Sequence, residues 1–229
     1  MSDMQDKPHH LGHRERLRRR VLDRGADSLA DYELLEYLLF GVRRQGDTKP
    51  TAKALIDRFG SVAGVLAAPA AELATVKGVS EATIALIAVA AETARRAVRE
   101  EISDGPVLSS WTKLIDYLRV AMGHGRTEEF RLLFLDSKNR LIADEVQGTG
   151  TVNRTAVYPR EVVKRALEHG ATAIIMVHNH PSGDPTPSRA DVEMTEEVRD
   201  AGALLGIVLH DHVVISKSGH ESFKSMGLL

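Results

Sequence analysis

The 229-residue chain contains no cysteine, so disulfide bonds and thiolate metal sites are excluded. No apolar run approaches the length of about 20 residues that a membrane-spanning helix needs. The formal net charge is only −2, which gives no overall positive field to attract nucleic acid or a membrane. The first residues lack the charged-then-apolar layout of a secretory signal. We therefore expect a cytoplasmic globular protein without a membrane partner, in which His, Asp or Glu would bind any metal.

The pattern of apolar residues divides the chain into an all-helical part and a part that mixes strands with helices. Residues 1–12 are polar and are predicted to form a disordered tail. Helical patterns then predict an all-α domain over residues 13–103. The stretch EEISDGP, residues 100–106, is acidic, contains Gly-Pro and lacks apolar periodicity, which predicts a linker. Residues 107–229 are predicted to form an α/β (α+β) domain.

The most informative part of the sequence is the string HNHPSGDPTPSRAD, which begins at His178 and ends at Asp191. It follows the apolar run 173–176, which is typical of a buried strand, so His178 and His180 would project to the same side. A loop rich in Pro and Gly then leads to a helix that begins near Ser188 and has Asp191 in its first turn. Two imidazoles and one carboxylate are the ligands of a catalytic zinc ion, which keeps one position for water. The sequence therefore predicts a Zn²⁺ site formed by His178, His180 and Asp191.

Two other interpretations of these residue types remain open. Ser188 and Asp191 also fit an ordinary helix start, with a serine N-cap and an acidic residue at the third helical position. A second His-x-His pair, His210 and His212, has the spacing of metal ligands but is not followed by an acidic helix start. We therefore favour positions beside the core, on a strand, for this second pair.

These residues also carry a resemblance to a known family. The pattern H-x-H-x7-S-x2-D matches that of the JAMM (JAB/MPN-type) zinc metallopeptidases, and the longer string resembles the bacterial RadC (UPF0758-type) branch. Further similar stretches are EEFRLLFLD at 128–136, VYPREV at 157–162 and LHDHVVI at 209–215. The resemblance is strong over residues 108–229 and looser over 10–100. It implies a three-layer, cytidine-deaminase-like fold with a mixed central sheet.

The resemblance also implies an activity, which is zinc-dependent hydrolysis of an amide or isopeptide bond in a peptide substrate. In JAMM enzymes a glutamate on the first strand is the general base, and the Glu-x-Phe pattern of this branch points to Glu128. Glu129 is the alternative base, because a shift of one residue along the strand would exchange the two side chains. Ser188 would donate a hydrogen bond to the oxyanion of the substrate. Under the alternative interpretation both glutamates are ordinary surface residues.

The first part of the chain supports a second hypothesis, in which the protein is a DNA-binding accessory factor of repair or recombination and the metal is not catalytic. The stretch LATVKGVSEATIAL, residues 73–86, resembles a helix-hairpin-helix motif, whose backbone N–H groups contact a DNA phosphate. Its candidate DNA contacts are Lys77, Gly78 and Ser80, although Ser80 replaces a preferred glycine and can be a plain N-cap.

The segment HRERLRRRVLDR, residues 13–24, is rich in arginine, and it offers Arg18 and Arg19 as further candidate contacts with DNA. Leu17, Val21 and Leu22 give the same segment an apolar side. The alternative is therefore a solvated helix that docks on its neighbour through these three residues.

Overall fold

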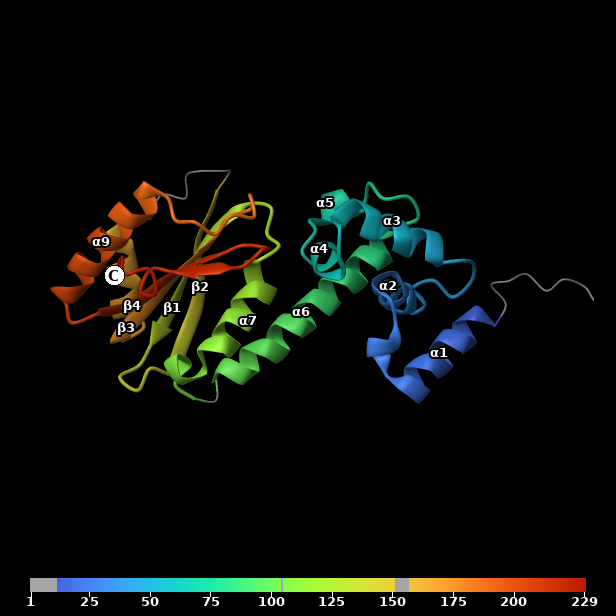
Figure 1. Cartoon of the computed structure of the whole chain (residues 1–229), viewed down its shortest axis with the longest axis horizontal. Helices are drawn as coiled ribbons and strands as arrows, with labels where there is room; N and C mark the ends of the chain where they lie inside the picture. Colours follow the sequence, from blue (N-terminus) through green and yellow to red (C-terminus); the bar gives the residue numbers. More distant parts are fainter. Residues whose placement is uncertain (1–11, 104, 151–156) are drawn as a thin grey trace, which may run out of the picture. The chain divides into compact units, whose positions relative to one another are not determined.

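The computed structural model describes residues 12–103, 105–150 and 157–229 (Figure 1). Within those ranges no helix combines the length and the apolar character that crossing a bilayer requires. All but the last residue of the predicted disordered tail, 1–12, lies outside the described residues. The chain forms two compact units, which meet in sequence between Glu92 and Thr93.

The boundary between the units differs from the predicted linker at 100–106. Helix α6 (Glu81–Ser103) includes the boundary and continues into the residues that were expected to form the linker. Ile102 explains the difference, because it is 1% exposed and lies in a hydrophobic cluster of the second unit. Because Glu100 and Glu101 precede Ile102, the segment resembles a solvated linker, and the sequence does not reveal this one apolar contact.

The first unit is all helical, as predicted. It contains α1 (His13–Arg24), η1 (Ala26–Ser28), α2 (Asp31–Leu39), α3 (Lys49–Phe59), α4 (Val62–Leu66), α5 (Ala70–Leu73) and the first part of α6. Its core is formed by buried aliphatic side chains from α2 to α6, which include Leu35, Leu55, Val65, Leu73 and Ile87. Burial of such side chains stabilises short helices that would be marginal alone.

The second unit contains a five-stranded sheet with strand order β2-β1-β3-β4-β5. The strands are β1 (Glu128–Leu135), β2 (Leu141–Gly150), β3 (Ala173–Asn179), β4 (Val208–Ile215) and β5 (His220–Ser222). Strands β3 and β4 are parallel and the other pairs are antiparallel. The helical elements are η2 (Val107–Ser110), α7 (Trp111–Met122), α8 (Pro159–Glu168) and α9 (Arg189–Ala203).

Helices cover both faces of this sheet, which gives the three layers and confirms the predicted fold class (Figure 1). On β3, Ile175 and Val177 pack in the cluster that contains α7, whereas Ile174 and Met176 pack in the cluster that contains α8 and α9. Every residue of β3 is buried, which explains its continuous apolar run. His178 follows Met176 by two residues and therefore points to the α8/α9 face.

The connection from β3 to β4 positions the candidate site. Because β3 and β4 are parallel, the chain must cross over between them, and α9 forms this crossover. The carboxyl end of β3, with His178, is therefore followed by the loop 180–188 and the first turn of α9, with Asp191. Residues that are 13 positions apart in the sequence are brought together in this way.

Candidate metal centre

The two histidines of the HNH string lie side by side at the carboxyl end of β3. Their Nε2 atoms are 3.0 Å apart, and the His178 side chain is 2% exposed. His180 lies just beyond the strand, but its backbone N–H still donates to the carbonyl oxygen of Ile215 on β4 (2.8 Å). This bond keeps the extended backbone in line, so both imidazoles project to the same side.

Asp191 approaches the histidines from the first turn of α9. Its Oδ1 lies 3.6 Å from the Nε2 of His178, and its Oδ2 lies 3.9 Å from the Nε2 of His180. The backbone N–H and hydroxyl of Ser188 donate to Asp191 Oδ2 (2.7 and 2.6 Å), and the Asp191 N–H donates back to Ser188 Oγ (3.2 Å). Ser188 and Asp191 thus form a helix N-cap, which at the same time holds the carboxylate beside the histidines.

The spacing of the two histidine nitrogens fits a zinc ion. With bonds of about 2.0–2.1 Å, tetrahedral coordination separates neighbouring ligand atoms by about 3.3 Å. The two histidine nitrogens, 3.0 Å apart, are close to this value. The distances of 3.6 and 3.9 Å join two different oxygens of Asp191 to the two histidines, and the residues whose single ligand atoms all lie within 4.8 Å of one another are Glu128, His178 and His180. Zinc binding by His178, His180 and Asp191 stays a prediction.

Glu128 is the acidic residue of β1 that shares the histidine face. One of its carboxylate oxygens and one nitrogen from each of His178 and His180 lie within 4.8 Å of one another. Two residues further along β1, Phe130 packs in the hydrophobic cluster that contains α8 and α9, as expected for the same face. Its role as a general base stays a prediction.

Glu129 has a different environment. Its carboxylate accepts hydrogen bonds from Arg131 Nη2 (2.7 Å) and Nε (3.1 Å), and its backbone N–H donates to the side-chain oxygen of Asn179 (2.7 Å). Arg131 is also paired with Asp144 on β2 (2.7 Å), whose side chain is 2% exposed. The carboxylate of Glu129 therefore balances the charge of a largely buried guanidinium group.

A buried histidine that the sequence did not connect with the site lies directly behind His178. The Nδ1 of His178 is 2.8 Å from the Nε2 of His212, and the Nδ1 of His212 is 2.6 Å from the hydroxyl of Thr195 on α9. His212 occupies a strand position in the core, as expected, and is fully buried. Its contact with His178 depends on the β3–β4 register, which pairs Met176 with His212 and which the sequence does not reveal. His210 instead contacts Asn139 (2.6 Å).

Burial controls the charge of these histidines. It lowers the pKa of His178 to about 4, although the Asp191 carboxylate acts in the opposite direction. Burial also lowers the pKa of His212 well below its ordinary value of 6.5. Both rings are therefore neutral near pH 7, and the neutral imidazole is the form that binds metals.

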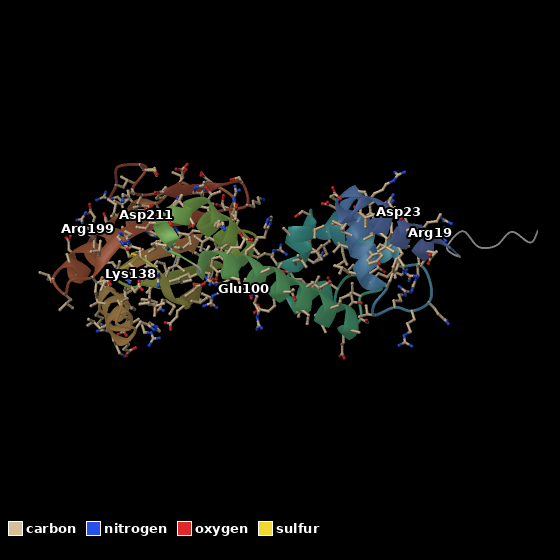
Figure 2. The ribbon with its side chains drawn as sticks, turned by 90° about the horizontal axis from the view of Figure 1, so that it is seen from below. Arg19, Asp23, Glu100, Lys138, Arg199 and Asp211 are labelled. Carbon is tan, nitrogen blue, oxygen red and sulfur yellow. The ribbon has the colours of Figure 1, made fainter. Side chains whose placement is uncertain are left out.

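A separate hollow of about 290 Å³ lies away from the histidine pair. Among its lining residues are Trp111, His210, Asp211 and Lys224. Asp211, labelled in Figure 2, accepts hydrogen bonds there from the Ser222 hydroxyl (2.5 Å) and the Lys224 N–H (3.0 Å). The carboxylate of Asp211 thus has a structural role in holding the segment after β5.

The candidate DNA contacts of the turn before α6 have local roles. Lys77, Gly78 and Ser80 are exposed. Gly78 has φ +86°, and a Cβ atom added there would lie 2.5 Å from the hydroxyl oxygen of Thr51, so the turn needs glycine at this position. The hydroxyl of Ser80 accepts the N–H of Thr83 (3.3 Å), which is the plain N-cap interaction.

The two arginines proposed as DNA contacts lie on the exposed side of α1. Arg18 and Arg19 both pair with Glu15, at 2.8 and 3.5 Å; Figure 2 labels Arg19. Exposed pairs of this kind contribute little to stability. Contact of either arginine with DNA stays a prediction.

Comparison with known families assigns both parts of the chain. Residues 108–228 match the family described as RadC-like JAB domain, and residues 9–85 match the family described as UPF0758 N-terminal. The first match includes all of β1 to β5 and every residue of the candidate metal site. The chain therefore belongs to the RadC-like family, in which a helical N-terminal region precedes a JAB domain.

Proposed function

We propose that the JAB domain is a zinc-dependent hydrolase that cleaves an amide or isopeptide bond. The observation that carries this proposal is the convergence of His178, His180 and Asp191, from β3 and α9, with the carboxylate of Glu128 beside them from β1. Zinc held by the first three residues would supply a Lewis acid and an activated water molecule.

Glu128 is proposed as the general base. A base must lie within hydrogen-bond reach of the proton that it removes, and a carboxylate is suited to this step. The carboxylate of Glu128 lies within 4.8 Å of both ligand nitrogens, which is near enough to reach a water molecule between them. Removal of the proton by Glu128 would leave the ligands themselves unchanged.

Ser188 is proposed to stabilise the oxyanion that develops on the substrate. Its hydroxyl has a single hydrogen atom, which it donates to Asp191 Oδ2 in this structure. To serve the substrate, this hydrogen must leave Asp191, whose Oδ2 still accepts from the backbone N–H of Ser188. The backbone bond would thus keep Asp191 in place while the hydroxyl turns towards the substrate.

The proposal is tested by measuring metal content and hydrolysis together. Protein purified without chelator is expected to contain about one zinc per chain, and H178A, H180A and D191A are expected to lose it. Hydrolysis is then measured on a panel of linear and isopeptide-linked fluorogenic peptides. The proposal fails if the wild-type protein contains no transition metal, or if the ligand variants hydrolyse the panel as fast as the wild type.

DNA binding by the first unit is the second candidate function. It is supported by exposed cationic side chains on α1, among which Arg16 and Arg24 form no ion pair with any residue that the structure describes. Phosphate contacts would release counterions and would make binding depend strongly on salt.

A further inference from the structure

We propose that His212 is a positioning residue that fixes the tautomer of His178, so that the lone pair of His178 Nε2 faces His180 and Asp191. Four groups form a continuous row of hydrogen bonds from β3 through β4 to α9. The row runs from His178 Nδ1 to His212 Nε2 (2.8 Å), from His212 Nδ1 to Thr195 Oγ1 (2.6 Å), and from Thr195 Oγ1 to the backbone carbonyl oxygen of Asp191 (2.5 Å).

The direction of the row is set at its carbonyl end. A carbonyl oxygen only accepts hydrogen bonds, so the hydroxyl of Thr195 must donate to Asp191. That hydroxyl has one hydrogen, and it can therefore only accept from His212. The hydrogen between His212 and Thr195 must then be carried by Nδ1 of His212.

The same logic continues to the candidate metal ligand. A neutral histidine with a hydrogen on Nδ1 has a bare Nε2, which accepts a hydrogen bond. The Nε2 of His212 therefore accepts from Nδ1 of His178, and Nε2 of His178 is left without a hydrogen. This is the atom that lies 3.0 Å from His180 Nε2 and 3.6 Å from Asp191 Oδ1.

The surroundings of His212 disfavour the alternative in which both of its nitrogens carry a hydrogen. The side chain is fully buried, its ring stacks on Phe223 with centroids 4.5 Å apart, and Phe130 contacts it edge-on at 6.2 Å. A cation between two aromatic rings and two neutral hydrogen-bond partners would be buried without a counter-charge, which is costly. The rings also leave the imidazole little freedom to rotate.

His180 reaches the same tautomer by an independent route. Its Nδ1 lies 2.8 Å from the carbonyl oxygen of Asp184, which can only accept, so Nδ1 carries a hydrogen, and a neutral His180 ring has a bare Nε2. In that form both histidines present a lone pair to a shared metal ion. Thr195 lies four residues after Asp191 on α9, so the row also connects this helix with β3 and helps to set the distance from Asp191 to His178.

The consequence for metal binding rests on the proposed zinc site, whereas the tautomers are properties of the metal-free chain. Hydrogen bonds to the second nitrogen of a ligating histidine fix its orientation, and their loss typically lowers metal affinity by about 10- to 100-fold. We therefore expect His212→Phe, which keeps an aromatic ring but no acceptor, to lower Zn²⁺ affinity within this range.

The experiment combines ¹⁵N–¹H NMR of the histidine rings in the metal-free protein with Zn²⁺ titration against a competing chelator. Wild-type His178 and His212 are expected as the tautomers with hydrogen on Nδ1. His212→Gln, whose amide can accept from His178 and donate to Thr195, is expected to bind Zn²⁺ to within about threefold of the wild type, well inside the penalty for losing such a bond. His210→Phe, on the same strand but hydrogen-bonded elsewhere, is the matched control and should leave both measurements unchanged.

Thr195→Val is a second variant, because it removes only the hydroxyl and does not depend on replacing the buried ring. Without that acceptor, His212 and His178 should each populate both tautomers. The proposal is overturned if metal-free wild-type His178 carries its hydrogen on Nε2, or if His212→Phe folds and binds Zn²⁺ like the wild type. If the wild type binds no zinc, the proposed hydrolase function is wrong. The NMR result alone then still decides which nitrogen of His178 and of His212 carries the hydrogen. Zinc binding without hydrolysis would likewise contradict the proposed hydrolase activity, but it would not contradict the positioning role of His212.

Discussion

At the scale of single residues, Glu128 and Glu129 show how the alternation of side chains along a strand assigns different chemistry to two adjacent carboxylates. Glu129 points to the side of Arg131 and compensates its charge, while Glu128 lies beside the histidine pair. The period of two places adjacent residues on opposite faces in any strand. It does not say which face carries the histidines, because that depends on pairing with β3.

The two glutamates predict opposite results for the same substitution. Glu128→Gln should keep bound zinc and lower kcat by about 100-fold or more, because a general base contributes this much. Glu129→Gln should leave kcat nearly unchanged and cost about 1–2 kcal/mol of unfolding free energy, because it weakens a charge-assisted hydrogen bond to Arg131. Zinc content, kcat and urea unfolding of both variants check this. Equal loss of activity in the two variants would remove Glu128 from its proposed role.

The sequence predicted which candidate ligands lie close together better than it predicted the contacts behind them. His178, His180 and Asp191 are brought together because a short loop, 180–188, connects a strand end with a helix start, and both features leave local signals in the sequence. The position of His212 behind His178 leaves no such signal. It follows from the β3–β4 register, which is set by side chains from both clusters on the two faces of the sheet.

At the scale of elements, a turn leaves a signal in the sequence where one side chain accepts most of the hydrogen bonds within it. In the β1–β2 turn, Asp136 Oδ1 accepts the N–H groups of Lys138 (2.8 Å) and Arg140 (2.9 Å), and Asn139 has φ 58°. The end of α6 could not be predicted in this way. There Ile102, one residue buried by the second unit, outweighs an acidic and glycine-containing context.

The turn before α6 predicts a measurable steric effect. Gly60 and Gly78 both have positive φ, +82° and +86°, but a Cβ atom at Gly60 meets nothing within 4 Å, whereas one at Gly78 lies 2.5 Å from Thr51 Oγ1. Gly60→Ala should therefore cost about 1–2 kcal/mol from backbone strain alone, and Gly78→Ala should cost clearly more. Urea unfolding of the two variants checks this. Equal costs would show that the contact with Thr51 relaxes freely.

Strand β2 and helix α8 predict a pH-dependent contribution to stability. Hydrogen bonds from Arg165, and then from His169, lower the pKa of Glu145 from 4.5 to about 2. A carboxylate whose pKa is lowered by folding stabilises the folded state above its unfolded pKa, and this stabilisation is lost as the pH falls through the folded value. The difference in unfolding free energy between wild type and Glu145→Gln should be constant above about pH 5 and shrink between about pH 4.5 and 2. A difference that does not change over this range would contradict the assignment.

At the scale of the whole molecule, a net charge of −2 conceals an uneven distribution. Helix α1 carries six arginines against Glu15 and Asp23. The structure separates these arginines by role. Arg14 donates to the carbonyl oxygens of Arg43, Arg44 and Gly46 and lies over the ring of Phe40, so it attaches α1 to the rest of the first unit. Arg16 and Arg24 have no such structural contacts among the described residues.

Because Arg14, and not Arg16 or Arg24, attaches α1 to the first unit, Arg16 and Arg24 can be replaced to test DNA binding without unfolding that unit. If α1 contacts phosphates, the full-length chain should bind a short duplex with an affinity that falls steeply between about 50 and 200 mM salt. The double variant Arg16→Gln/Arg24→Gln should weaken binding and reduce the slope of log affinity against log salt by about 2, since each lost phosphate contact removes about 1. Fluorescence anisotropy over a salt series measures both quantities.

The matched control is Arg160→Gln/Arg189→Gln, which removes the same charge from exposed positions in the second unit. A general electrostatic attraction would weaken equally in both double variants, because net charge is the only property that they share. A contact surface on α1 would be affected by the first pair alone, because counterions are released only where phosphates are neutralised. Equal effects of the two pairs, or no binding by the wild type at low salt, would therefore exclude α1 as a DNA-binding surface and leave the arginines of α1 as solvated charges.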